Sequence, residues 1–168
     1  MNRDLIAPAQ SQSILELIQS VLILELISPS KRIWLGSAWI SDIPILDNES
    51  LAFSDLEPSW LAQKISLSTL LLTIAQRGTE IIIITRKSDD NKYFMDKIKN
   101  SELYNKNIKI IIRDNFHEKG LLGEDYELFG TMNFTFNGIN SNDEHIVYRS
   151  DKAIIAERQI SMSNKYDI

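Results

Sequence analysis

Apolar positions along the first half of the chain alternate between helical spacing and short unbroken runs. Residues 11–30, "SQSILELIQSVLILELISPS", place apolar side chains at helical spacing between a starting Ser and a closing Ser-Pro, which predicts a mostly buried helix. The apolar run in 31–40 predicts a strand, and 60–78 predicts a second helix that ends at Gly78. Four consecutive isoleucines in 79–86 are typical of a strand whose sheet is covered on both faces.

The second half continues the alternation and then changes character. Residues 88–104 predict an exposed helix capped by Ser88 or Asp89, and 107–114 predict another buried strand. Two strands then follow in 116–123 and 126–133, joined by a turn at Glu124-Asp125, before a strand in 144–150 and a closing helix in 151–166. Between the first strand and the second helix, 41–59 reads as a long polar loop with two prolines.

This order of elements predicts an α/β fold with a mixed β-sheet flanked by helices. The length of 168 residues suits one domain over 1–168, because two domains of that total length would each have a small core. The composition, 43% hydrophobic and 24% charged, is ordinary for a globular protein.

Charge and cysteine content narrow the functional classes. The net charge is −5, yet residues 86–119 carry nine basic against six acidic residues, so a local field can favour a phosphate although the molecule is acidic. The chain has no cysteine, which excludes disulfides and thiol chemistry and suits a reducing cytoplasm. The apolar segment 14–27 is interrupted by charged residues and is too short for a bilayer span, so we expect no signal peptide and no membrane helix.

Candidate chemistry gathers at the predicted hairpin. His117 and Lys119 are two apart and would share one face of a strand, with Glu118 pointing away. The partner strand would bring Asn133 to the same end of the sheet. An imidazole can attack phosphorus or move a proton, while an ammonium and an amide can hold phosphate oxygens. A lone His-x-Lys is usually coincidence, so the remaining spacing decides its value.

The residues just before Asn133 add to this group. Gly130 would let the backbone approach a ligand closely, and Thr131 supplies a hydroxyl. Ser37, Trp39 and Asp42 follow the first strand, where sites in α/β proteins often lie, although packing is the simpler role for Trp39. One His without clustered carboxylates is a poor metal-ligand set, so no metal and no other cofactor are expected.

In this order and spacing, His117, Lys119, Gly130 and Asn133 resemble the signature of the phospholipase D superfamily, His-x-Lys followed by an acid and then Gly-Ser-x-Asn. The run "GTMNFTFNGINSNDEHIVY" is similar to the small single-motif bacterial endonucleases of that superfamily, with Asn142 and Glu144 in their last two motif places. The resemblance is specific over 116–148, and "IWLGSAWISDIPIL" is similar to small members found in bacterial defence gene clusters.

Two positions depart from the signature. Thr131 replaces the motif serine and keeps its hydroxyl, while Glu124, with Asp125 beside it, occupies the place of the motif aspartate. The gap from that acid to Gly130 is one residue short, which predicts a tighter turn and leaves the role of the acid open.

The resemblance implies metal-independent phosphodiester cleavage through a phosphohistidine, which requires two such motifs. This chain has one, and its other histidine, His145, lies outside any His-x-Lys context. The implied partner is therefore a second copy, in a homodimer whose two-fold axis passes through the site, with help at the interface from the first helix, Trp34 and Trp39. Glu144 would then orient the imidazole of His117.

The leading interpretation is thus a cytoplasmic nuclease acting on nucleic acid, most plainly DNA. One alternative is a phosphodiesterase for lipids, for which an aromatic-rich loop facing a membrane would be expected. Another is a DNA-binding or scaffold subunit that works with other proteins of a bacterial defence complex.

Overall fold

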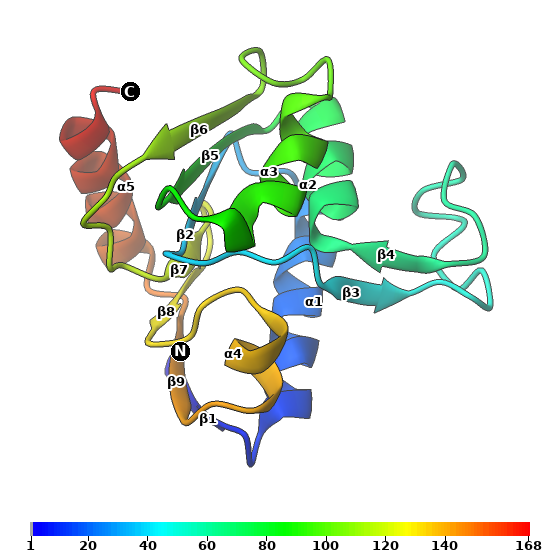
Figure 1. The fold of residues 1–168 in the computed structure, drawn as a ribbon, viewed down its shortest axis with the longest axis horizontal. Helices are drawn as coiled ribbons and strands as arrows, with labels where there is room; N and C mark the ends of the chain where they lie inside the picture. Colours follow the sequence, from blue (N-terminus) through cyan, green and yellow to red (C-terminus); the bar gives the residue numbers. More distant parts are fainter. Residues whose placement is uncertain (1) are drawn as a thin grey trace.

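The central sheet has seven strands in the order β1–β9–β8–β7–β2–β5–β6 (Figure 1). The structure is a computed structural model and describes residues 2–168. Parallel pairing joins β2, β5 and β6, whereas every other neighbouring pair is antiparallel, so the predicted mixed sheet is confirmed. The strands are β1 (Asn2–Ala7), β2 (Arg32–Gly36), β5 (Glu80–Thr85), β6 (Ile108–Ile112), β7 (Gly120–Leu122), β8 (Glu127–Gly130) and β9 (Glu144–Arg149).

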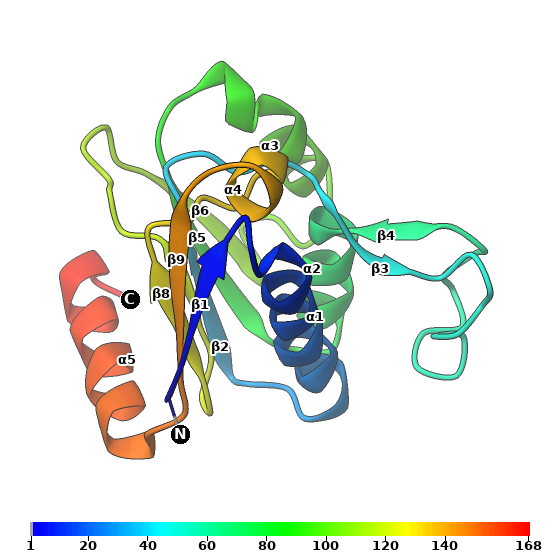
Figure 2. The same cartoon turned by 90° about the horizontal axis from the view of Figure 1, so that it is seen from below.

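Helices cover both faces of this sheet, as Figure 2 shows. One face carries α1 (Ser11–Ile27), α2 (Leu67–Gln76) and α3 (Lys92–Lys99), and the other face carries α5 (Lys152–Tyr166). The isoleucine run of β5 serves both layers: Ile81 and Ile83 pack toward α1 and α2, while Ile82 and Ile84 pack toward α5. The expectation of a sheet covered on both faces is confirmed.

The segment expected to be a long loop contains a second, two-stranded sheet. It is formed by β3 (Pro44–Asp47) and β4 (Lys64–Ser66), and this arm projects away from the body in Figure 1. The second helix therefore begins at Leu67 and not at residue 60. The physical reason is the cap, because the Ser66 hydroxyl accepts a hydrogen bond from the backbone N–H of Thr69.

Two further elements, besides β3 and β4, were not predicted. β1 pairs antiparallel with β9 along the edge of the sheet, and its short alternating pattern buries only Leu5 and Ala7. The helix α4 (Phe136–Asn140) has five residues, too few for an apolar period to be recognised, and Thr135 caps it by accepting from the N–H of Gly138.

The predicted strand 116–123 is too long at its start. The last residue of β2, Gly36, pairs with Gly120, and β2 has no residues beyond it that could pair with 116–119. That segment therefore leaves the sheet as an extended loop, and β7 begins at Gly120.

The surfaces that we expected to cover a dimer interface are largely used inside the chain. Trp34 is buried against α5, where its indole N–H donates to Gln159. The apolar face of α1 packs on the sheet, leaving only Leu24 and Ile27 as large exposed apolar side chains of that helix. None of the helices in residues 2–168 combines the length and apolar character needed to cross a bilayer.

Candidate active site

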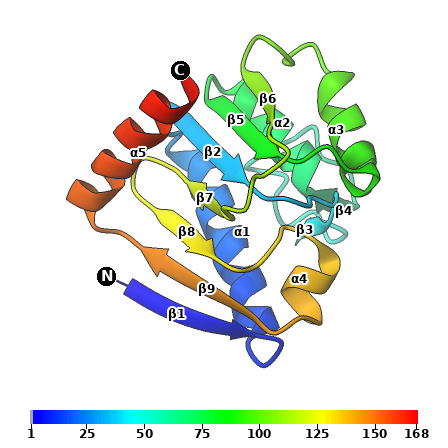
Figure 3. The ribbon, with the colours of Figure 1, turned by 60° about the vertical axis from the view of Figure 1, so that its left-hand side comes forward.

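The segments that follow β2, β5 and β8 meet the start of β7 at one edge of the sheet (Figure 3). The meeting follows from the register, because Gly120 at the start of β7 lies between the last residue of β2 and Phe129 of β8. The parallel strands β2 and β5 also end here, so the loops after their carboxyl ends reach the same place. Ligand sites of α/β sheets form at such edges.

His117 lies in the loop before β7, and its exposed imidazole contacts an arginine. Nη2 of Arg86 is 2.6 Å from Nε2 and 3.0 Å from Nδ1 of the ring. Nε of Arg86 donates to the carbonyl of Phe116 at 2.7 Å, which ties the guanidinium to the same loop. Because a guanidinium can only donate, the imidazole can hydrogen-bond to it only through a ring nitrogen that carries no proton.

Lys119 stays close to His117, while the residue between them points to the other side. The Lys119 ammonium donates to the backbone carbonyl of His117 at 2.9 Å. The carboxylate of Glu118 accepts hydrogen bonds from Arg158 and Lys165 of α5. Glu118 thus points away from the imidazole toward α5, as the alternation predicted, although the segment is not a strand.

Burial by itself would raise the pKa of Glu118, but the hydrogen bonds from Lys165 and Arg158 outweigh it and leave that pKa below its usual value. Glu118 is therefore an ionised anchor for α5. Its carboxylate holds the loop that carries the imidazole.

Asn133 is held with its amino group available. Its Oδ1 accepts from the Ser37 hydroxyl at 3.2 Å and from the backbone N–H of Trp39 at 3.4 Å. Both partners are donors, so the amide oxygen faces them and its nitrogen faces outward. Among the hydrogen bonds of residues 2–168, none takes up the Nδ2 protons.

Ser37 has a different role from the one we expected. Its side chain is completely buried, and its hydroxyl also contacts the Trp39 carbonyl and accepts from the N–H of Phe134. A buried hydroxyl with these partners positions the loop of Asn133 and does not reach a substrate. Ser37 is thus a positioning residue and not a substrate-binding one.

Gly130 and Thr131 pack against and hydrogen-bond to the neighbouring strand β9. A Cβ on Gly130 would lie 1.9 Å from the carbonyl oxygen of His145, so the glycine is required by β9 and not by a ligand. The Thr131 hydroxyl accepts from the N–H of His145, and the Thr131 N–H donates to the His145 carbonyl. These contacts fix the chain just before Asn133.

Glu144 does not orient His117 as we had inferred. Among the hydrogen bonds of residues 2–168, the Glu144 carboxylate has one side-chain partner, the Asn142 amide at 3.4 Å. The imidazole of His117 contacts the guanidinium of Arg86 instead. The reason is local: Glu144 is the first residue of β9 and pairs with Ala7 of the edge strand β1. The ring of His145 lies 3.4 Å from Asp4, away from the motif as expected.

The acid at the motif position lies far from His117. Glu124 and Asp125 form the turn between β7 and β8, at the opposite end of those strands from His117. Asp125 contacts Lys152 of α5, and the Glu124 N–H donates to Ser30. Their role is therefore to close the hairpin.

Asp42 is likewise structural. Its side chain is almost fully buried, accepts from the N–H of Ser68 and pairs with Lys97 at 2.7 Å. The hydrogen bond that Lys97 donates to Asp42 raises the pKa of Lys97.

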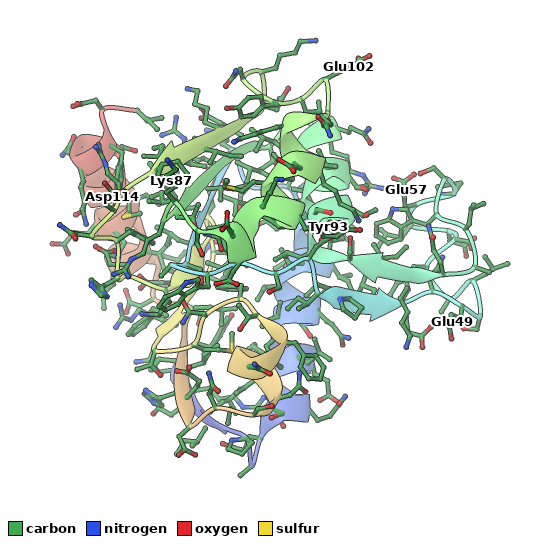
Figure 4. All side chains as sticks on the ribbon, in the orientation of Figure 1. Glu49, Glu57, Lys87, Tyr93, Glu102 and Asp114 are labelled. Carbon is green, nitrogen blue, oxygen red and sulfur yellow. The ribbon has the colours of Figure 1, made fainter. Side chains whose placement is uncertain are left out.

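A shallow hollow of ≈ 700 Å³ opens beside the imidazole. It is lined by residues 113–118 and by Lys165 and Tyr166 at the end of α5. In Figure 4, Lys87 and Asp114 mark the loops after the neighbouring strands β5 and β6, which border this region. Among residues 2–168, no three His, Asp or Glu side chains are grouped so that they could hold a metal ion.

Sequence reasoning missed Arg86, the residue that contacts the imidazole. Arg86 directly follows β5, and its guanidinium also lies 5.6 Å from the centre of the Trp39 ring. A signal was present, since it is a polar residue just after a buried parallel strand. Nothing in the sequence pairs it with a loop thirty residues later.

The comparisons with known proteins agree with this geometry. Residues 58–165 match the family described as "Cardiolipin synthase, PLD-like domain", which is more than half of the chain. The protein therefore belongs to the phospholipase D-like family. This membership supports a phosphodiesterase of the phospholipase D superfamily, as the His-x-Lys and Asn residues predicted.

Solved structures of the same fold include small bacterial proteins. NucT from Helicobacter pylori aligns with a TM-score of 0.66 at 14% identity, over 99% of this chain and 96% of that one. Nuc from Salmonella typhimurium, a phospholipase D family member, aligns with a TM-score of 0.64 at 14% identity, over 99% and 94%. The archaeal chromatin protein TrmBL2 aligns with a TM-score of 0.59 at 13% identity, over 99% of this chain and 53% of that one.

At these identities the structures establish the fold alone. The chain has no match among curated protein sequences.

Proposed function

We propose that the protein is a metal-independent phosphodiester hydrolase that cleaves DNA through a phosphohistidine intermediate. The observation that carries the proposal is the outward-facing amino group of Asn133 at the same sheet edge as the His117 imidazole and the Lys119 ammonium. A nucleophile accompanied by an ammonium and an amide donor suits a phosphodiester, whose non-bridging oxygens are negative.

In the first step an unprotonated nitrogen of His117 attacks phosphorus, and the bond from phosphorus to the leaving oxygen breaks. A second imidazole donates its proton to that oxygen. In the second step the same imidazole, now neutral, takes a proton from water as the water oxygen attacks phosphorus. The P–N bond breaks and His117 is regenerated, so one water has been added across the cleaved P–O bond.

The second imidazole is assigned to another copy of the chain. His145 is excluded from the role by its place on β9, with its ring near Asp4. A two-fold axis at the sheet edge would bring the partner's motif to face the first. Two large apolar side chains are exposed on the segments that hold the site, Trp39 and Phe136, and they replace α1 and Trp34 as the surface proposed to support that contact.

DNA is the proposed substrate on two grounds. The sequence over 116–148 resembles small bacterial endonucleases, and TrmBL2, a chromatin protein that binds DNA, has the same fold. The lipid alternative finds little support in the β3–β4 arm, where Glu49 and Glu57 are labelled in Figure 4. Its aromatic residue Trp60 is buried, and Phe53 is partly buried against the core, so the arm does not present aromatic side chains outward.

A second candidate is a DNA-binding subunit that performs no chemistry. The observation in its favour is the contact of Arg86 with the imidazole nitrogens, because a nitrogen that accepts from a guanidinium is not available to attack. Cleavage assays separate the two candidates directly.

The test is cleavage of supercoiled plasmid and of bis(p-nitrophenyl) phosphate by the purified protein in excess EDTA. We expect both substrates to be cleaved at the rate seen without chelator. Loss of activity in EDTA with recovery on adding Mg²⁺ would contradict the metal-independent mechanism. Retention of plasmid in a gel shift without cleavage of either substrate would favour the binding subunit.

A further inference from the structure

Arg86 differs from the other buried or half-buried arginines in having no carboxylate partner. Each of Arg32, Arg77, Arg149 and Arg158 pairs with a glutamate at 2.6–3.1 Å. Within residues 2–168 no ion pair is made by Arg86, although its side chain is only partly exposed. Its positive charge is therefore not neutralised by the protein itself.

The backbone of Arg86 is held rigidly. The fully buried side chain of Asn91 donates to the carbonyls of Arg86 and Ala38 and accepts from the N–H of Ile40. This one amide ties the loop after β5 to the loop after β2. A guanidinium on a fixed backbone is the kind of preorganised group that a phosphate site requires.

The guanidinium itself has partners on two sides. On one side is the ring of Trp39, 5.6 Å from Cζ, and on the other are the Phe116 carbonyl and the imidazole of His117. None of these partners carries a negative charge. A phosphate oxygen would be a stronger partner, because hydrogen bonds between ions are about twice as strong as neutral ones.

We propose that Arg86 is a phosphate-binding residue of this site, which holds a ring nitrogen of His117 in the free protein and transfers to a non-bridging phosphate oxygen when the substrate binds. The proposal rests on the function proposed above. Phosphorus must come within about 3–3.5 Å of the attacking nitrogen. Nη2 of Arg86 lies 2.6 Å from Nε2 and 3.0 Å from Nδ1 of His117, so the oxygens of a phosphate at either nitrogen enter the space that the guanidinium already reaches.

The exchange also removes the conflict with nucleophilic attack. The guanidinium and phosphorus compete for one lone pair on the imidazole, so the bound anion has to draw Arg86 away before the P–N bond can form. Arg86 thereby links phosphate binding to release of the nucleophile.

The test measures binding of inorganic vanadate, a mimic of the phosphoryl group, by calorimetry to the purified full chain. The variants are Arg86→Met, Arg86→Lys and, as a matched control, Arg3→Met on the edge strand β1, where Arg3 pairs in register with Tyr148 at the far end from the site. We expect Arg86→Met to weaken vanadate binding by about 10- to 100-fold, the range for a hydrogen bond to a charged group. Arg86→Lys should lose less vanadate affinity, because lysine keeps the positive charge but lacks the planar set of N–H donors of a guanidinium. Arg3→Met should bind vanadate as tightly as wild type.

Restoring the guanidinium is the second measurement, and it distinguishes binding from a structural role. Free guanidinium chloride at millimolar concentration should recover part of the vanadate affinity of Arg86→Met, whereas urea should not. A loosened loop would not be repaired by either. If Arg86→Met fails to fold, the vanadate affinities of Arg86→Lys and wild type are compared instead.

Three outcomes would overturn the assignment: equal vanadate binding by Arg86→Met and wild type, tighter binding by the variant, or no binding by wild type. The fate of the proposed function is separate. If vanadate binding depends on Arg86 but the protein cleaves no diester, the phosphate-binding role of Arg86 is supported and the proposed hydrolase function is wrong.

Discussion

At the residue scale, the site is built from a few side chains whose neighbours define their roles. His117 has an exposed ring whose nitrogens contact only Arg86 among the described residues, and Asn133 has its oxygen fixed by Ser37 and Trp39. His145 belongs to another environment, with its ring beside Asp4 and its side chain about half exposed. Two histidines in one short chain are thereby given different expected roles.

The two histidines allow a direct prediction. His117→Ala should remove detectable cleavage of bis(p-nitrophenyl) phosphate, because nucleophilic and acid–base roles are each worth orders of magnitude in rate. His145→Ala should keep most of the wild-type rate. The fold of both variants is checked by circular dichroism. Equal losses from the two substitutions would show that the motif has been assigned to the wrong histidine.

At the element scale, the loop that carries His117 depends on α5. Glu118 joins that loop to Arg158 and Lys165, and Arg158 also reaches Glu127 of β8. The loop before β7 and the strand β8 are thus linked to α5 by charge, and Leu122 of β7 shares an apolar cluster with Ile155 of α5.

The ionisation of Glu118 predicts how this link depends on pH. Its pKa in the folded chain lies below the unfolded value, so its contribution to stability is present above the unfolded pKa and is lost as pH falls through the folded pKa. Glu118→Gln should therefore lower the melting temperature at neutral pH and have progressively less effect on acidification below the unfolded pKa. Thermal unfolding from pH 7 to pH 3 is the measurement.

Asp125→Asn is the matched control for that experiment. Asp125 pairs with Lys152 of the same helix, but both side chains are largely exposed to solvent. Exposed pairs contribute little, so this substitution should leave the melting temperature almost unchanged at every pH. A Glu118→Gln effect that persists undiminished at pH 3 would show that the link is packing and not charge.

At the scale of the whole molecule, charge is distributed unevenly around the site. The segment after β5 contributes Lys87, Lys92 and Lys99 to one surface hollow, together with Asp89 and Asp96. Lys109 of β6 pairs with Glu80 at the start of β5. That places it near the opposite edge of the sheet from His117.

DNA binding should reflect this distribution. We expect affinity to fall steeply with salt, and Lys87→Gln to weaken binding and reduce the slope of log K against log [salt] by about 0.9 if one phosphate contact is lost. Lys109→Gln should change neither quantity. Fluorescence anisotropy with a labelled duplex at several salt concentrations provides the measurement. An affinity that ignores ionic strength would point to a small substrate or a protein partner.

The shared site is the other prediction at this scale. Light scattering should find a dimer at micromolar concentration, because the proposed chemistry needs an imidazole from each of two chains. A mixed dimer of wild type and His117→Ala should be nearly inactive, since its one composite site lacks an imidazole. Half of the wild-type activity in that species would mean that each chain holds a complete site.

The sequence alone determined the layers and the motif. Periodicity located α1, β2, β5, β6, β9 and α5, because burial on one or both faces leaves a repeat that local reading detects. It located His117, Lys119 and Asn133 by spacing. It misplaced the start of α2 and missed β1, β3, β4 and α4, whose apolar patterns are too short to be distinctive.

Only the tertiary structure decided what surrounds His117. Arg86 reaches His117 because β5 and β7 flank β2, a neighbour relation that no local pattern contains. The same applies to Ser37, which is buried against the loop of Asn133, and to Glu144, which the edge pairing of β9 with β1 directs elsewhere. Contacts between residues far apart in the chain depend on strand order and register, and these are properties of the assembled sheet.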